Sequence, residues 1–200
     1  MVLLKVTVTN LREVLKTAVE TLKTGGIVAY PTETFYGLGV KFDLEQSLKR
    51  LYEIKQRPKD KAMPLIIGEK RLLASIASSI NSAAESLIDG FWPGPLTLLV
   101  PAGENISEWL TAGTRNIAVR VPGESFALEL VRHAGFPITS TSANISGFPP
   151  ARDAATVRKY FSDDIDLIVD GGEAPGGLPS TIVDTTGNGI RIVRKGAILP

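Results

Sequence analysis

The sequence has 200 residues, 44% of them apolar, and its 22 Lys and Arg residues nearly balance its 21 Asp and Glu residues. A chain of this length and apolar content can bury a sizeable core, which argues against disorder, and a net charge of +1 excludes a global field that draws the protein onto nucleic acid or an anionic membrane. The lack of cysteine excludes disulfides, Cys-ligated zinc and thiol nucleophiles, and a single histidine leaves little histidine chemistry.

Hydrophobic patterning divides the chain into alternating strands and helices. It predicts strands over residues 2–8, 26–30, 64–67, 96–100, 116–122 and 190–196, a strand followed by a turn within residues 166–172, and a turn followed by a strand within residues 176–184. It predicts helices over residues 10–25, 44–54, 72–89, 125–134 and 153–161, with a break near Asn81 in the third. No repeat, low-complexity linker or change of composition divides the chain, so we expect one domain over residues 1–200.

Two of these helices begin with a capping-box pattern. Asn10 is followed three residues later by Glu13, so we expect Asn10 to cap the first helix. Asp43 is followed in the same way by Gln46, so we expect Asp43 to begin the second.

Basic residues concentrate at the end of the second predicted helix. They are Lys49, Arg50, Lys55, Arg57, Lys59 and Lys61, against Glu53 and Asp60. Because Pro58 lacks a backbone N–H and disfavours helical geometry in the preceding residue, we expect Lys55 and Arg57 at the last turn and exit of the helix. Two interpretations stay open: the cations stabilise the negative end of the helix dipole, or they form a cradle for a polyanion such as a phosphate chain.

Polar side chains also follow several predicted strands at the point where each strand ends. They are Thr32, Arg120, Ser140, Ser142, Asn144, Ser180 and Arg194. Residues 139–146 alone contain five hydroxyl side chains and one carboxamide. Ligands of open α/β sheets bind at the carboxyl ends of strands, so this pattern predicts a binding edge, although a hydroxyl-rich loop that satisfies its own backbone is the alternative.

The motifs of common nucleotide and hydrolase sites are missing. The sequence contains no GxxxxGK[ST] loop, no GxGxxG fingerprint and no GxSxG elbow. A site rich in cations and hydrogen-bond donors suits chemistry at phosphates, in which positioning and charge neutralisation do most of the catalytic work. Magnesium would then be carried with the phosphates, with no dedicated protein ligands.

Seven segments resemble, in order, the motifs of the YrdC-like threonylcarbamoyl-AMP synthase family. They are GIVAYPTETFYGLG (26–39), KQRP with PL (55–58 and 64–65), WPGPLT (92–97), VRVP (119–122), SANISG (142–147), PSTIVD (179–184) and RKG (194–196). Each segment is weak by itself, but seven in register over nearly the whole chain are specific. The sequence departs from the family pattern at Gly68, where many relatives have histidine, and at Pro179, where many have glutamate.

The resemblance implies a single-domain α/β fold, with a twisted, open, mixed sheet flanked by helices and a deep positively charged groove. It implies an enzyme that converts L-threonine, bicarbonate or CO2, and ATP to threonylcarbamoyl-AMP and pyrophosphate, with Mg2+. A downstream threonylcarbamoyl transferase complex would pass the group to tRNA, at the adenosine beside the anticodon, and the chain could also contact tRNA or other RNA.

The same resemblance implies roles for individual residues. Lys55, Arg57, Ser142 and Asn144 match the family's tetrad around the ATP phosphates, Lys59 and Arg194 match further ATP positions, and Thr32, Arg120, Ser140 and Ser180 match positions around threonine. An arginine such as Arg120 can pair with the threonine carboxylate. Hydroxyl residues can select a β-hydroxy amino acid, because an analogue without the hydroxyl leaves polar groups of the site unpaired.

Two other functions stay open from the sequence. A module that binds double-stranded RNA or tRNA without catalysis would spread its basic residues along one face, whereas here they are concentrated in one short segment. A carbamoyl-adenylate enzyme that uses carbamoyl phosphate, like the YrdC-like domain of hydrogenase maturation proteins, normally has zinc-finger and acylphosphatase-like neighbours, for which this chain has neither the cysteines nor the length. No apolar run reaches the length of a membrane span and no signal-peptide pattern follows Met1, so we expect a cytoplasmic protein.

Overall fold

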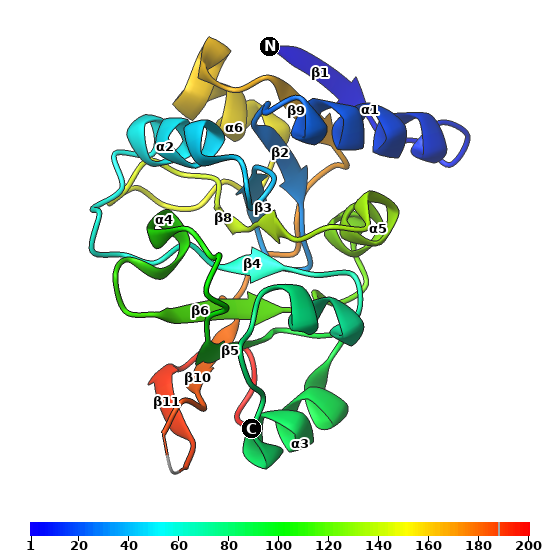
Figure 1. Cartoon of the computed structure of the whole chain (residues 1–200). Coiled ribbons are helices and arrows are strands. Elements are labelled where there is room, and N and C mark those ends of the chain that lie inside the picture. The colour runs from blue at the N-terminus through cyan, green and yellow to red at the C-terminus, as the bar shows by residue number, and fades with distance from the viewer. Residues whose placement is uncertain (188) are drawn as a thin grey trace.

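The computed structural model describes residues 1–187 and 189–200, and its strands form two mixed sheets. The first has the order β1-β9-β2-β3-β8 and contains β1 (Val2–Lys5), β2 (Val28–Pro31), β3 (Tyr36–Gly39), β8 (Thr141–Ser142) and β9 (Leu167–Asp170). The second has the order β11-β10-β5-β6-β4-β7 and contains β4 (Leu65–Ile66), β5 (Leu96–Pro101), β6 (Asn116–Arg120), β7 (Ile138–Thr139), β10 (Thr181–Asp184) and β11 (Arg191–Arg194). Figure 1 shows the first sheet in the half of the molecule that holds the N-terminus and the second in the half that holds the C-terminus. The α/β class with mixed strands and flanking helices is confirmed, but the strands divide between two sheets where the sequence predicted one.

Helices flank both sheets. They are α1 (Leu11–Lys23), α2 (Glu45–Ile54), α3 (Ser82–Phe91), α4 (Glu108–Thr111), α5 (Phe126–Ala134) and α6 (Ala154–Phe161), with short 3-10 helices η1 (Lys70–Ser75) and η2 (Ser162–Asp164). The predicted break near Asn81 is confirmed, because the Asn81 side chain accepts a 2.9 Å hydrogen bond from the Ala84 N–H and begins α3. Within the described part of the chain, no helix is both long enough and apolar enough to cross a bilayer.

Asn10 takes the N-cap position of α1 as predicted, but neither predicted capping box forms. The Asn10 side chain accepts instead from the Thr7 N–H, at 2.7 Å, and makes no cap bond to α1. Asp43 pairs with Lys41 at 2.5 Å, and Leu44 takes the N-cap position of α2. In both cases the polar side chain is used by the preceding turn, and such local bonds compete with capping.

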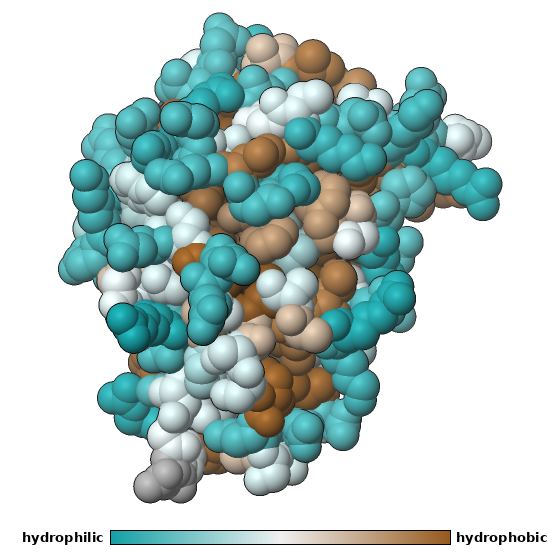
Figure 2. Space-filling view, viewed as in Figure 1, coloured by the Kyte–Doolittle hydropathy of each residue, from teal (hydrophilic) through white to brown (hydrophobic). Residues whose placement is uncertain are grey.

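The central strands of the first sheet are buried on both faces by two hydrophobic clusters. In β2, Val28 and Tyr30 belong to the cluster that contains the apolar stripes of α1 and α5. Ala29 belongs to the other cluster, together with residues of α2, α6 and the central strands of the second sheet. This distribution follows from the two-residue period of strand side chains. On the face shown in Figure 2, hydrophilic residues cover most of the periphery and apolar residues reach the surface mainly over the middle and lower parts.

The chain passes from one sheet to the other at Ser140. Strand β7 ends at Thr139 in the second sheet, and β8 begins at Thr141 in the first. The Ser140 N–H donates to the Pro64 carbonyl oxygen at 2.8 Å, and the buried Tyr30 hydroxyl donates to the Thr139 carbonyl oxygen at 2.9 Å. The hydroxyl-rich segment 139–146 is therefore fixed where the two sheets meet.

Candidate functional site

A solvent-open cavity adjoins the junction at Ser140, and its empty volume is about 750 Å³ with the open solvent at its mouth included. Its lining includes Thr32, Arg57, Arg120, Ser140, Ser142, Ser180 and Arg194, which are seven of the ten predicted site residues. The other lining residues come from both sheets and their turns: Thr34, Phe35, Tyr36, Gly37, Pro64, Leu65, Ile66, Thr97, Thr141, Pro179 and Ile182. Over residues 1–187 and 189–200, three arginines and no carboxylate line the cavity. A deep groove of positive charge beyond this cavity stays a prediction.

We call the part of the cavity around Thr32 and Arg120 its enclosed end, because both residues are buried, and the part around Ser142 and Arg194 its open end, because both residues are exposed. Thr32 and Arg120 are buried, with exposed fractions of 6% and 8%. Ser142 and Arg194 are exposed. The two ends therefore suit a small ligand and a larger one, respectively.

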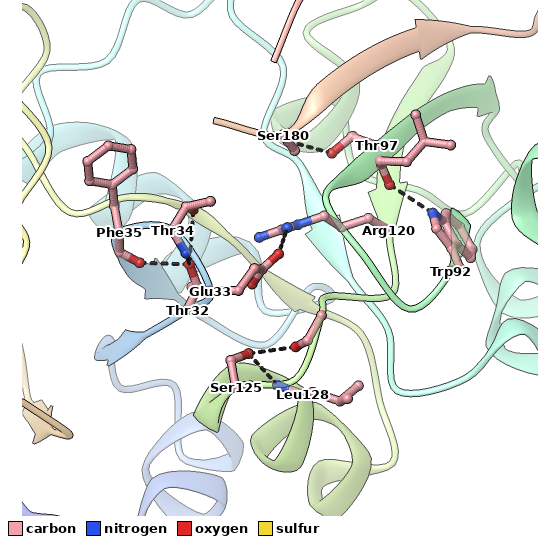
Figure 3. Close-up of polar contacts among 12 residues, drawn as sticks. Thr32, Glu33, Thr34, Phe35, Trp92, Thr97, Arg120, Ser125, Leu128 and Ser180 are labelled. Atoms are coloured by element: carbon pink, nitrogen blue, oxygen red, sulfur yellow. Dashed lines mark hydrogen bonds and ion pairs between the residues drawn. The ribbon is translucent and has the colours of Figure 1, made fainter. Parts of the chain in front are cut away.

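Arg120 reaches the enclosed end because of strand alternation. In β6, Val119 packs in the hydrophobic core, so Arg120 points away from it, as the sequence predicted. Its Nη1 atom forms an ion pair with Oε1 of Glu33 (Figure 3). The pairing was not predicted from the sequence, in which Glu33 was considered only as a turn residue.

Glu33 is held by the turn between β2 and β3. The Thr32 hydroxyl donates to the Phe35 carbonyl oxygen at 2.7 Å and accepts from the Thr34 N–H at 3.1 Å (Figure 3). These side-chain to backbone bonds are the local role that the sequence offered as the alternative for this turn. Thr32 also lines the cavity, so the turn both shapes the enclosed end and fixes Glu33 beside it.

Lys55 lies beside the cavity and holds the loop that follows β8. It is the C-terminal cap of α2, as predicted, and is 2% exposed. Its Nζ atom donates to the carbonyl oxygens of Ser142, at 2.5 Å, and Asn144, at 2.6 Å. Burial, with a smaller effect from the charge of Arg57, lowers the pKa of Lys55 to about 7. Both of its protonation states are therefore populated near neutral pH.

Asn144 supports the loop and does not line the cavity. Its Oδ1 atom accepts from the Ser142 hydroxyl at 2.6 Å. Its Nδ2 atom donates to the carbonyl oxygens of Ile145, at 3.0 Å, and Phe148, at 2.7 Å. Asn144 thus orients the Ser142 hydroxyl while it closes the loop.

Arg57 and Lys59 diverge after the end of α2. Arg57 lines the cavity, and its Nη2 atom donates to the Ala62 carbonyl oxygen at 2.6 Å. Lys59 does not line the cavity but a second depression beside Tyr52 and Trp109, which Arg57 also lines, and its Nζ atom lies 5.6 Å from the Trp109 ring centroid. The structure therefore brings Arg57 to the other predicted site residues but not Lys59.

Ser180 and Arg194 meet on the side of the cavity formed by β10 and β11. The Nη2 atom of Arg194 donates to the Ser180 hydroxyl at 3.0 Å and to its carbonyl oxygen at 2.8 Å. The Ser180 hydroxyl is also 2.9 Å from that of Thr97 (Figure 3). Thr97 lines the cavity and was missed by the sequence analysis, although a threonine between the core residues Leu96 and Leu98 was a signal.

The two departures from the family pattern have different surroundings. A Cβ atom on Gly68 would lie 2.9 Å from Cα of Arg132, so α5 packs against this position and leaves no room for a side chain. Gly68 does not line the cavity. Pro179 does, and its carbonyl oxygen accepts from the Ala197 N–H at 2.9 Å.

Comparison with known proteins gives consistent matches over most of the chain. A family model named Sua5_yciO_yrdC, described as "Telomere recombination", matches residues 20–196. The sequence is 41% identical over 165 residues to a threonylcarbamoyl-AMP synthase of Pyrococcus abyssi, covering 82% of this chain and 48% of that protein. It is 40% identical over 167 residues to a protein of the same name from Idiomarina loihiensis, covering 82% of this chain and 89% of that protein. The crystal structure of P. abyssi Sua5 complexed with L-threonine has a TM-score of 0.93 and 36% identity, covering 98% of this chain and 58% of that one. The chain thus spans about half the length of the P. abyssi relative and most of the Idiomarina one.

Proposed function

The chain belongs to the Sua5/YciO/YrdC family, and from this premise we propose that it is a threonylcarbamoyl-AMP synthase. Its substrates would be L-threonine, bicarbonate or CO2, and ATP, and its products threonylcarbamoyl-AMP and pyrophosphate. The observation that carries the proposal is the single cavity in which residues predicted for threonine (Thr32, Arg120, Ser140, Ser180) meet residues predicted for the ATP phosphates (Arg57, Ser142, Arg194).

The enclosed end suits the amino acid. Arg120 offers a guanidinium for the carboxylate, in surroundings where water screens the charges weakly. The hydroxyl groups of Thr32 and Ser140, with that of Ser180 beside Arg194, offer partners for the substrate hydroxyl. A relative whose crystal structure contains L-threonine supports this assignment.

The open end suits the nucleotide. Arg57 and Arg194 supply positive charge where the phosphates would lie, and Lys55 and Asn144 hold the Ser142 loop beside them. The threonine ammonium would lose two protons to solvent, one to become the amine and one as its nitrogen bonds to the carbon of CO2, whose C=O electron pair moves to oxygen and leaves a carbamate. A carbamate oxygen would then bond to the α-phosphorus, and the bond from that phosphorus to the bridging oxygen would break, so pyrophosphate leaves with the electron pair. This in-line transfer needs positioning and charge neutralisation and no protein nucleophile.

Magnesium would enter with the triphosphate. The donors of the cavity are hydroxyls and guanidinium groups, and the described residues contain no cluster of three or more Asp, Glu, His or Cys side chains that could hold a metal. This donor set fits an ion whose ligands are mainly phosphate oxygens and water. When bound, the ion would neutralise part of the phosphate charge.

The product is a mixed anhydride of a carbamic acid and AMP, which needs an acceptor. We propose that a downstream threonylcarbamoyl transferase complex transfers the threonylcarbamoyl group of this product to a tRNA adenosine. We also propose that the reaction takes place in the cytoplasm. The exposed cations of the basic segment 49–61 would favour any direct contact with tRNA.

The experiment that tests the function measures pyrophosphate release from ATP and Mg2+, with threonine and bicarbonate omitted in turn. Release that requires both supports the synthase. Release that is indifferent to threonine but depends on carbamoyl phosphate would replace it with a carbamoyl-adenylate enzyme. No release, together with RNA binding that weakens steeply with salt, would replace it with a binding module.

A further inference from the structure

The ion pair between Glu33 and Arg120 uses only half of the carboxylate. Oε1 of Glu33 accepts from Nη1 of Arg120, and the two side chains are only 16% and 10% exposed. Oε2 of Glu33 is buried and has no hydrogen-bond partner among the described residues. An arginine and a carboxylate can bind through two parallel bonds, and a buried oxygen left without a partner destabilises the folded state. Stability alone therefore does not explain this arrangement.

Both backbones of the pair are held in place. Arg120 ends β6, where the Ile67 N–H donates to its carbonyl oxygen at 3.0 Å. Glu33 is carried by the turn that the Thr32 hydroxyl closes. A Cβ atom on Gly123 would lie 3.5 Å from Cγ of Glu33, so the chain after β6 also packs against the Glu33 side chain. The ion pair thus joins two fixed points and sets the direction of the guanidinium.

The rest of the guanidinium is available to the cavity. The bond from Nη1 to Glu33 is the one hydrogen bond found for the Arg120 side chain within the described residues, and Arg120 lines the cavity. Figure 3 shows Glu33 and Arg120 pointing toward each other, with Thr32 and Thr34 beside Glu33. Glu33 also offsets one of the three arginine charges, and it does so at the enclosed end only.

We propose that Glu33 is a positioning residue for the amino-acid end of the site. It holds Arg120 by one nitrogen and so directs the remaining N–H groups to the carboxylate of the bound amino acid. By offsetting the charge of Arg120, it also makes this end less attractive to phosphates than the end that contains Arg57 and Arg194. The inference rests on the proposed function, because it takes L-threonine as the amino acid.

The test measures binding by titration calorimetry for the wild-type protein, Glu33→Ala, Glu33→Gln, Arg120→Ala and the double variant Glu33→Ala/Arg120→Ala. Glu33→Ala should weaken L-threonine binding by about tenfold or more and change ATP binding less than about threefold. Glu33→Gln should lose less of the affinity for L-threonine, because its amide oxygen can still accept a hydrogen bond from Nη1 of Arg120. The preference for L-threonine over L-threoninamide, which lacks the carboxylate, should also fall more in Glu33→Ala than in Glu33→Gln.

The double variant distinguishes positioning from a merely structural role. If Glu33 acts through Arg120, adding Glu33→Ala to Arg120→Ala should weaken L-threonine binding by less than about twofold further. The control is Glu129→Ala, which removes an exposed pair with Arg132 on α5 and should bind both ligands as the wild type does.

Unchanged L-threonine affinity in Glu33→Ala, equal weakening of L-threonine and ATP, or fully additive losses in the double variant would each overturn the inference. If Glu33→Ala does not fold, the same comparisons of L-threonine and ATP affinity are made with Glu33→Gln and with the double variant Glu33→Gln/Arg120→Ala. Wild-type protein that binds no L-threonine would overturn the proposed function and this inference with it. Wild-type binding with unaffected Glu33 variants would overturn the inference alone.

Discussion

The Nζ atom of Lys55 lies 2.5 Å from the main-chain carbonyl oxygen of Ser142. Because Lys55 also donates to the Asn144 carbonyl oxygen at 2.6 Å, one buried amino group holds the loop after β8 against the end of α2. The residue that the family resemblance assigns to ATP is thus, in this structure, the anchor of the loop that carries Ser142. Phosphates that bind at the open end of the cavity would lie next to this anchor.

Replacing Lys55 by methionine keeps most of the side chain and removes both bonds. We expect amide hydrogen exchange over residues 142–148 to rise by about tenfold or more and ATP affinity to fall by a similar factor, since each lost bond involves a charged group. The melting temperature should change little, because methionine also removes a buried charge. Lys49→Met is the control, because Lys49 is on the exposed side of α2 and its one ion pair within the described residues is with Glu45, at 3.0 Å. Unchanged exchange in the loop would contradict the anchor role.

ATP binding should be coupled to proton uptake by Lys55. Burial lowers the pKa of Lys55 from 10.5 to about 7, so at pH 8 most of the free protein has a neutral amine there. Phosphate charge favours the ammonium form and raises the pKa, so binding takes up protons, and affinity should fall as pH rises above 7. Calorimetry at pH 8 in two buffers of different ionisation enthalpy should detect uptake approaching one proton per ATP. The same uptake in Lys55→Met would assign the proton to another group.

Arg57 and Lys59 are close in sequence but should differ in their effect on catalysis. Arg57→Ala removes a cation from the cavity lining and should lower pyrophosphate release by about a hundredfold, which is typical of an electrostatic group at a reacting phosphate. The melting temperature should stay close to that of the wild type. Lys59→Ala removes a cation that lies over Trp109, outside the cavity, so kcat/KM for ATP should change less than about threefold. Equal losses of activity in the two variants would mean that Lys59 reaches the nucleotide. A large drop in the melting temperature of Arg57→Ala would mean that Arg57 stabilises the fold.

Gly196 should not tolerate alanine. A Cβ atom there would lie 2.2 Å from the Pro179 carbonyl oxygen and 2.5 Å from the main chain of Ser180, so the segment after β11 would have to move. We expect Gly196→Ala to lower the free energy of unfolding by about 1–3 kcal/mol and to weaken L-threonine binding, because Gly196 packs directly against the main chain of Ser180, which Arg194 contacts at 2.8 Å. Chemical denaturation and calorimetry measure the two effects.

Gly90→Ala provides the matched control. Gly90 lies in α3, and a Cβ atom there meets nothing within 4 Å. Alanine is the better helix residue, so this variant should be more stable by about 0.5–1 kcal/mol and should bind L-threonine as the wild type does. A Gly196→Ala protein with wild-type stability and binding would show that the segment can shift without cost.

Strand periodicity predicted much of this architecture from the sequence. The alternation over residues 116–122 correctly placed Arg120 opposite Val119, because a period of two directs neighbouring side chains to opposite faces whatever the neighbouring strand is. The break at Asn81 was also predictable, because its cap is a local interaction with Ala84. Features that depend on a few adjacent residues are thus visible in the sequence.

Long-range features were not visible. The division into two sheets depends on strand pairing, and the two-residue strands β7 and β8, which flank Ser140, are too short to show a period. The pair between Glu33 and Arg120 and the contact of Lys55 with Ser142 each join residues 87 positions apart. The Asn10 and Asp43 side chains form no cap bond for a local reason, because Thr7 and Lys41, which precede the helices, engage them instead.

The central claim is that one cavity between the sheets holds both substrates. A crystal structure with L-threonine, Mg2+ and a non-hydrolysable ATP analogue tests it most directly. We predict the threonine carboxylate within hydrogen-bond distance of Arg120 and the phosphates between Arg57 and Arg194. Phosphates bound instead in the depression beside Lys59 and Trp109, with Arg120 free of the amino acid, would contradict the account.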